Sequence, residues 1–176
     1  MKPLTKLYLK TFLITGIPYG LMMIGIDLLN GDGFNIWKFL FLTFFFGIGM
    51  SLILVTLHKH GLKKLGIQEF TDENLGVRQT KSIKTNLGKT ELFNKLKSDP
   101  VIRTMKMIET ENGITLKTGM TWKSFGEEIK IIHKSENNSN FEYQISSNPK
   151  LKYTIVDYGK NLQNLNSIEN VIKNIS

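Results

Sequence analysis

Hydrophobic residues are concentrated in two long runs near the start of the chain. Residues 7–29 and 36–57 carry little charge, and the second run contains nineteen uncharged residues, 39–57, of which five are Phe. An α-helix rises 1.5 Å per residue, so about 20 apolar residues cross the roughly 30 Å hydrocarbon layer of a membrane. The pattern therefore predicts two membrane-spanning helices joined by a short polar turn.

The second half of the chain has shorter segments, several of which alternate between apolar and polar residues. Strands are predicted at 77–85, 101–109, 114–118, 128–134, 141–147 and, as a short addition, 153–156. One helix is predicted at 91–98, and the last helix begins near Asn161 as its N-cap. Helical spacing predicts one buried face on this last helix, made of Leu162, Leu165, Ile168, Ile172 and Ile175.

The order of these elements predicts an α+β fold behind an N-terminal two-helix transmembrane hairpin. Two topologies fit: a curved sheet that holds the C-terminal helix, and a split ferredoxin-like arrangement. The first is preferred because the strands after the first helix of the domain follow one another without another helix between them. The chain is thus divided into a hairpin at 1–60, a linker at 61–75 and an α+β domain at 76–176.

Lysines flank both outer ends of the hairpin, whereas the connecting turn is acidic. They are Lys2, Lys6 and Lys10 at the first end, and Lys59, Lys63 and Lys64 at the second. Because positively charged flanks stay on the cytoplasmic side, both termini are expected in the cytoplasm, beneath a bacterial inner membrane. A signal peptide also has a positive start, but no small-residue cleavage site follows the first run.

The net charge of +8 is unevenly distributed along the chain. Residues 1–65 hold seven Lys against two Asp, and residues 66–176 hold sixteen Lys and Arg against thirteen Asp and Glu. The C-terminal domain is therefore too weakly basic for a nucleic-acid-binding protein. The chain has no Cys and three His, so disulfides and thiolate chemistry are excluded and no metal or other cofactor is expected.

Small residues form a row on each predicted span. Gly16 and Gly20 are four residues apart in the first span, and Thr43, Gly47 and Ser51 repeat this spacing in the second. Such rows allow the backbones of two helices to approach closely in lipid. Packing within the hairpin is the favoured interpretation, and a face for a homo-oligomer is the alternative.

Motifs typical of enzymes are weak or misplaced. A K-T-G segment at 117–119 and an S-x-x-K segment at 147–150 are similar to motifs of the penicillin-binding enzymes, but their order is reversed. His133 has no acid or nucleophile at a useful spacing, and the neighbours Glu127 and Glu128 would point to opposite faces of a strand. An enzyme is the least expected class.

Two segments hold most of the candidate binding chemistry. They are Trp122, Lys123 and Phe125 in a loop between strands, and Asp157, Tyr158 and Lys160 just before the last helix. The free N–H groups at the start of that helix favour anions. The alternative is that Trp122 and Phe125 cover the core and that Tyr158 packs on the last helix.

The segments W-K-S-F-G-E at 122–127 and D-Y-G-K-N at 157–161 resemble parts of the soluble domain of uncharacterised bacterial proteins, some of which are membrane-anchored. The resemblance covers about residues 77–175 and leaves out the hairpin. It implies a compact antiparallel-sheet domain and brings no particular activity.

Together, these patterns favour a non-enzymatic membrane protein. The hairpin would hold a cytoplasmic α+β module near the bilayer, where the module binds a protein partner or membrane lipid. The alternative is a signal-responsive effector whose hairpin forms homo-oligomers and perturbs the membrane. Neither a nucleic-acid partner nor a cofactor is expected.

Overall fold

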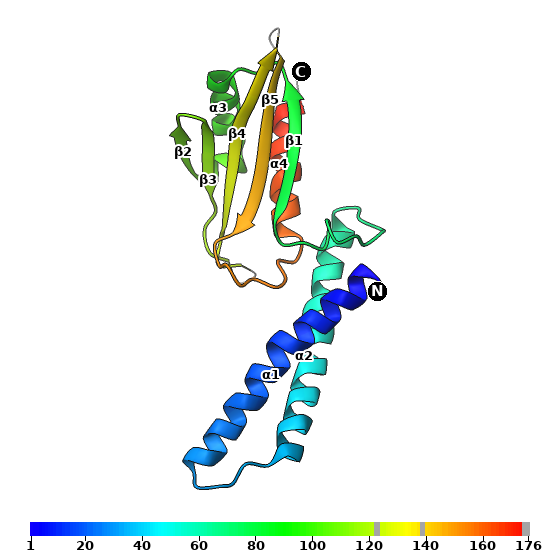
Figure 1. The fold of residues 1–176 in the computed structure, drawn as a ribbon. Helices are drawn as coiled ribbons and strands as arrows, with labels where there is room; N and C mark the ends of the chain where they lie inside the picture. Colours follow the sequence, from blue (N-terminus) through cyan, green and yellow to red (C-terminus); the bar gives the residue numbers. More distant parts are fainter. Residues whose placement is uncertain (122–123, 138–139, 174–176) are drawn as a thin grey trace. The chain divides into compact units, whose positions relative to one another are not determined.

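The computed structural model describes residues 1–121, 124–137 and 140–173. It divides the chain into two compact units, Met1–Leu75 and Gly76–Ser176. Two long apolar helices are followed by a five-stranded antiparallel sheet with helices, which confirms the predicted α+β fold with a helical hairpin (Figure 1). Of the residues singled out in the sequence, Trp122, Lys123 and Ile175 lie outside the described ranges.

The first unit is built on two helices, α1 (Pro3–Leu29) and α2 (Ile36–Lys64), each long and apolar enough to span a membrane. The side chain of Asn35 caps α2 by accepting the Lys38 N–H at 3.1 Å. Helix α2 extends beyond the predicted span because its contact face continues into the polar part of the sequence, where His58 and Leu62 are buried. The hydropathy pattern therefore predicted the end of the apolar segment, at residue 57, and not the end of the helix, at Lys64.

Residues 65–75 fold back onto the ends of these two helices. The carbonyl oxygen of the buried Leu75 lies 3.2 Å from His58 Nε2 on α2. Lys6 on α1 forms an exposed ion pair with Asp72, with 3.2 Å between Nζ and Oδ1. Within the predicted linker, 61–75, the first four residues therefore belong to α2 and the rest belong to the hairpin unit.

The second unit is built on one antiparallel sheet in the order β1-β5-β4-β3-β2 (Figure 1). The strands are β1 (Gln79–Thr85), β2 (Lys106–Thr110), β3 (Gly113–Lys117), β4 (Glu127–Asn137) and β5 (Asn140–Pro149). Each strand from β2 to β4 pairs with the next one in sequence, and β1 pairs with the far side of β5. This order agrees with the sheet of consecutive strands and excludes the split ferredoxin-like arrangement, which has a helix before its last strand.

Helices α3 (Lys89–Ser98) and α4 (Lys160–Lys173) cover one face of the sheet (Figure 1). The core between sheet and helices consists of Ile83, Leu92, Leu96, Ile102, Ile114, Leu116, Ile129, Ile131, Tyr143, Ile145, Leu165, Ile168 and Ile172. Burial of one aliphatic side chain of this size contributes about 1.5–3 kcal/mol. On the predicted apolar face of the last helix, Leu162 is only half-buried, whereas the next three positions belong to this core.

The predicted strand at 101–109 is wrong in its first part. Residues Ile102–Thr104 form a short 3-10 helix, and the strand begins only at Lys106. The carboxylate of Asp99 accepts hydrogen bonds from the N–H groups of Val101 and Ile102 at 2.9 and 2.8 Å. These local bonds turn the chain before the strand can begin, which alternation of apolar residues does not reveal.

Two expectations about the C-terminal segment also need correction. Residues 153–156 contain no strand, and β5 already pairs on both sides, with β1 and β4. Helix α4 begins at Lys160, one residue before the predicted N-cap Asn161. The capping side chain is Asp157, whose Oδ2 accepts the Asn161 N–H at 2.8 Å.

Candidate functional site

Two loops lie together at one end of the sheet. Residues 118–121 and 124–126 lie between β3 and β4, and residues 150–159 connect β5 to α4; we call these described parts of the two loops the loop end (Figure 1). They meet because Glu127, at the start of β4, pairs with Pro149, at the end of β5. Lys150 adds two hydrogen bonds between them, from its N–H to the Gly126 carbonyl at 2.9 Å and from its Nζ to the Thr118 carbonyl at 2.6 Å. The fold thus joins the two segments that the sequence marked as candidates.

Gly126 allows this close approach between the loops. Its φ of +93° lies in the left-handed region, and an added Cβ would lie 2.9 Å from the Thr118 carbonyl oxygen. Both the backbone conformation and the missing space exclude a larger residue without local rearrangement.

The two neighbouring carboxylates of β4 have separate partners. Glu127 is 1% exposed, and its carboxylate accepts hydrogen bonds from the hydroxyl groups of Thr118, at 2.5 Å, and of Ser124. Glu128 lies on the opposite face, where it forms ion pairs with Lys130 at 3.1 Å and Lys117 at 3.4 Å. The hydrogen bond from Lys130 lowers the pKa of Glu128 below its ordinary value. The pair is therefore not arranged for general acid–base catalysis.

Asp157 belongs to a buried polar network that joins α4 to β5. It is 3% exposed, and its Oδ2 accepts hydrogen bonds from both the N–H and the Nδ2 of Asn161 at 2.8 Å. Asn161 in turn accepts the Ser147 hydroxyl at 2.7 Å, and Asn164 donates to that hydroxyl at 3.2 Å. This candidate residue thus holds the fold together and does not face a ligand.

The other candidates near α4 are more accessible. Tyr158 is half-buried and has a left-handed backbone, with φ of 57°. Lys160 is also half-buried, and its Nζ lies 3.4 Å from Gln163 Oε1. A lysine ammonium group that makes one long hydrogen bond remains able to interact with an anion.

Apolar side chains are exposed on both loops of the loop end. Phe125 is 61% exposed, so it does not cover the core as one interpretation of the sequence suggested. Met120, in the same loop, and Leu151 and Tyr153, in the other loop, are also exposed. The sequence does not single out these three residues, because nothing local distinguishes an exposed apolar loop residue from a buried one.

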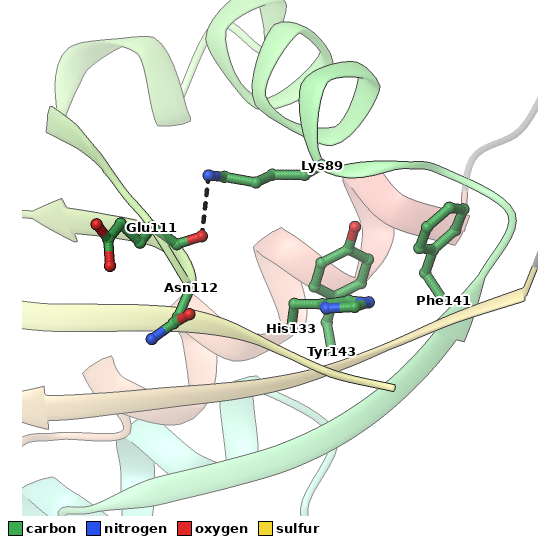
Figure 2. A pocket seen from close by; sticks show the side chains of 6 residues that line it. All are labelled: Lys89, Glu111, Asn112, His133, Phe141 and Tyr143. Carbon is green, nitrogen blue, oxygen red and sulfur yellow. Dashed lines mark hydrogen bonds between the residues drawn. The ribbon is translucent and has the colours of Figure 1, made fainter. Parts of the chain in front are cut away.

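A small pocket lies elsewhere in the domain, between the start of α3, the β2–β3 turn and strands β4 and β5. Its volume is about 160 Å³, and it is lined by Lys89, Glu111, Asn112, His133, Phe141 and Tyr143. Figure 2 shows Lys89 reaching over the pocket to the Glu111 carbonyl, at 3.2 Å, and the His133 ring lying against Tyr143.

Two polar side chains of this pocket, Lys89 and Tyr143, already bind protein atoms. Lys89 Nζ also donates to the Thr110 carbonyl at 2.7 Å, and the Tyr143 hydroxyl donates to the Leu87 carbonyl at 3.1 Å. His133 Nε2 is buried and lacks a hydrogen-bond partner among the described residues. This ring nitrogen is therefore inaccessible to solvent in the structure.

No group of three or more metal-ligating side chains occurs within the part of the chain that the structure describes. This result concerns His, Asp and Glu, since the chain has no Cys. The geometry of the described residues therefore offers no metal centre on which a mechanism could be built.

The small residues of the two long helices lie in the contact between α1 and α2. Gly16, Gly20, Thr43, Gly47 and Ser51 are all buried. An added Cβ would lie 2.6 Å from the Thr43 carbonyl oxygen at Gly16 and 3.1 Å from the Gly16 Cα at Gly47. Both rows thus face each other inside the hairpin unit.

Comparisons with known proteins add no assignment. No family model, curated protein or solved structure matches the chain.

Proposed function

We propose that this chain is an anchored protein of a bacterial inner membrane, whose cytoplasmic α+β domain binds a protein partner or membrane lipid near the bilayer. The outward surface of the two long helices carries this proposal. Their exposed large apolar side chains include Leu13, Leu21, Trp37, Phe41, Phe45, Leu52 and Ile53. Soluble proteins rarely expose a continuous apolar surface of this extent, whereas lipid covers it without cost.

The distribution of charge supports two crossings with both termini on one side. Within the apolar part of the hairpin, Asp27 pairs with Lys38, with 2.7 Å between Oδ2 and Nζ, next to the connecting turn. The other lysines of the hairpin lie toward its two outer ends. Because positive flanks stay in the cytoplasm, this distribution supports a cytoplasmic position for the domain after α2.

Anchoring would act by recruitment. A domain attached to a membrane-spanning hairpin stays within a few nanometres of the bilayer, which raises its effective concentration toward anything bound there. A non-enzymatic role is favoured because the two most buried carboxylates, Glu127 and Asp157, are engaged in hydrogen bonds that maintain the fold. The alternative of a membrane-perturbing effector was suggested by the small-residue rows. These rows contact each other between α1 and α2, so they do not support a face for a homo-oligomer.

Single cysteines can test the membrane topology, since the chain has none of its own. We expect a membrane-impermeant maleimide to label Asp32→Cys, in the turn, on intact spheroplasts. Glu111→Cys, in the β2–β3 turn, should react only after lysis. Extraction with carbonate should leave both variants in the membrane. Release by carbonate, or equal labelling of both positions before lysis, would contradict the proposed anchoring and orientation.

Binding can be tested in the same membranes. A photo-crosslinking residue at position 125 is expected to form adducts with a protein or with lipid, and the same residue at position 111 is the control. Absence of adducts specific to position 125 would contradict a binding function of the loop end.

A further inference from the structure

We propose that the loop end is a membrane-docking surface, which inserts apolar side chains between anionic lipid headgroups and binds those headgroups through lysine and arginine. This inference rests on the proposed function, because it assumes that the hairpin anchors the domain, and it selects lipid as the ligand of the loop end.

The first observation is the concentration of exposed apolar side chains. The described part of the domain exposes six large apolar side chains, and four of them lie on the two loops: Met120, Phe125, Leu151 and Tyr153. Tyr153 is 89% exposed and Met120 is 72% exposed. Aromatic and long apolar side chains on a polar background are the groups that enter the interface between headgroups and acyl chains.

The second observation is the sign of the accessible charge. Arg78, Lys150 and Lys152 are exposed at this end, and Lys160 is partly so. Three carboxylates near this end are engaged by protein groups. Glu127 and Asp157 are buried and accept internal hydrogen bonds, and Glu128 forms ion pairs with Lys117 and Lys130. The described surface of the two loops is therefore positive, which is complementary to an anionic leaflet.

The third observation is the point at which the chain enters the domain. Gln79, the first residue of β1, pairs with Ser147 near the end of β5, so β1 begins at the loop end. Gly76, the first residue of the domain, directly follows the hairpin unit in sequence. Only residues 76–78 precede the sheet, and three residues span at most about 10 Å. The covalent connection to the hairpin unit therefore enters at the apolar and basic end.

The opposite end of the sheet differs in both properties. The β2–β3 turn lies there, with the exposed acids Glu109 and Glu111 beside Lys89. None of the six exposed large apolar side chains of the described domain lies on this turn. This end is mixed in charge and polar, so it serves as an internal control for any general attraction to membranes.

The test uses the full-length protein in nanodiscs with an environment-sensitive NBD label on a single cysteine. Labels at Met120→Cys and Tyr153→Cys report on the loop end, and a label at Glu111→Cys reports on the opposite end. In nanodiscs with anionic lipid, we expect a blue shift and quenching by doxyl-labelled lipid at positions 120 and 153, with neither effect at 111. In purely zwitterionic nanodiscs, quenching at both loop-end positions should decrease.

Charge variants test the electrostatic part. Each cation near an anionic surface contributes a factor of about five to the binding constant. Replacing Arg78 and Lys152 by Gln should therefore lower the ratio of docked to free domain about 25-fold. Replacing Lys84 and Lys97 by Gln removes the same charge from exposed positions outside the loop end and should leave that ratio unchanged.

Docking on lipid would be overturned by three results. They are absence of quenching at 120 and 153 in anionic nanodiscs, equal quenching at 111, and an equal effect of the two charge variants. Carbonate extraction and maleimide labelling test the anchor separately, so an anchored protein with an unquenched loop end disproves this inference alone. Protein adducts at position 125 in that case would identify a protein as the ligand.

Discussion

The network around Asp157 allows a quantitative prediction for the stability of the domain. Asp157→Ala removes the acceptor of three hydrogen bonds, from the Gly159 N–H at 3.1 Å and from the N–H and Nδ2 of Asn161 at 2.8 Å. The first consequence is loss of the side-chain cap of α4. The second is a fully buried Asn161 amide that loses its partner on Nδ2.

The two consequences can be estimated separately. Loss of an N-cap costs about 1 kcal/mol, and a buried donor without an acceptor costs about 1–3 kcal/mol. We therefore expect Asp157→Ala to lower the free energy of unfolding of the domain by about 3 kcal/mol. A domain of this size is stable by about 5–15 kcal/mol, so the variant should fold but be clearly weakened.

Pulse proteolysis of the full-length protein in nanodiscs over a urea series can measure this change. For a slope of about 1.5 kcal/mol per molar urea, the midpoint should fall by about 2 M. Asp157→Ser can cap the helix but cannot reach both donors of Asn161, so its urea midpoint should lie between those of Asp157→Ala and the unmodified protein. Lys160→Ala, at a half-buried position beside the network, is the control and should shift little. A midpoint of Asp157→Ala equal to that of the unmodified protein would refute this account of the network.

Two further predictions concern the hairpin and the sheet. Gly16→Leu should weaken the contact between α1 and α2 by about 2 kcal/mol, because the new side chain meets a backbone oxygen. Gly49→Leu is the control, because nothing lies within 4 Å of a Cβ added at Gly49. Equal melting temperatures of the two variants in detergent would contradict the proposed clash at Gly16. Hydrogen bonds from Lys173 and Lys81, both at 2.5 Å, lower the pKa of Glu169. The ionised Glu169 therefore contributes its full stabilisation above the ordinary Glu pKa of about 4.3, and this stabilisation is lost as the pH falls through the lowered pKa. Glu169→Gln should cost about 1 kcal/mol at pH 7, and urea midpoints should show that this difference disappears at acid pH; a difference independent of pH would exclude the ion pairs as its cause.

The elements that the sequence predicted well are those defined by local periodicity. The two apolar runs and the apolar face of the last helix both follow from side-chain spacing within a short segment. Such segments bury one face almost regardless of their partner, so the pattern contains the information. The errors were also local in origin: the carboxylates of Asp99 and Asp157 set where a turn and a helix begin.

The sheet order depended on contacts between distant segments. That β1 would pair with β5, across more than fifty residues, cannot be read from the composition of either strand. This pairing nevertheless decides where the chain enters the domain, and hence which end of the sheet the hairpin is attached to. Register and strand order are properties of the folded whole.

The sequence by itself determined the two apolar helices, the α+β class, and the two segments in which binding chemistry is dense. It treated Phe125 and Asp157 as equal candidates, because a sequence pattern shows residue types and not their accessibility. Only the tertiary structure separated them: Asp157 is buried at the start of α4, whereas Phe125 is exposed. Burial depends on segments that arrive from elsewhere in the chain, and it also withdraws the acidic charge from the loop end and leaves lysine and arginine on its surface.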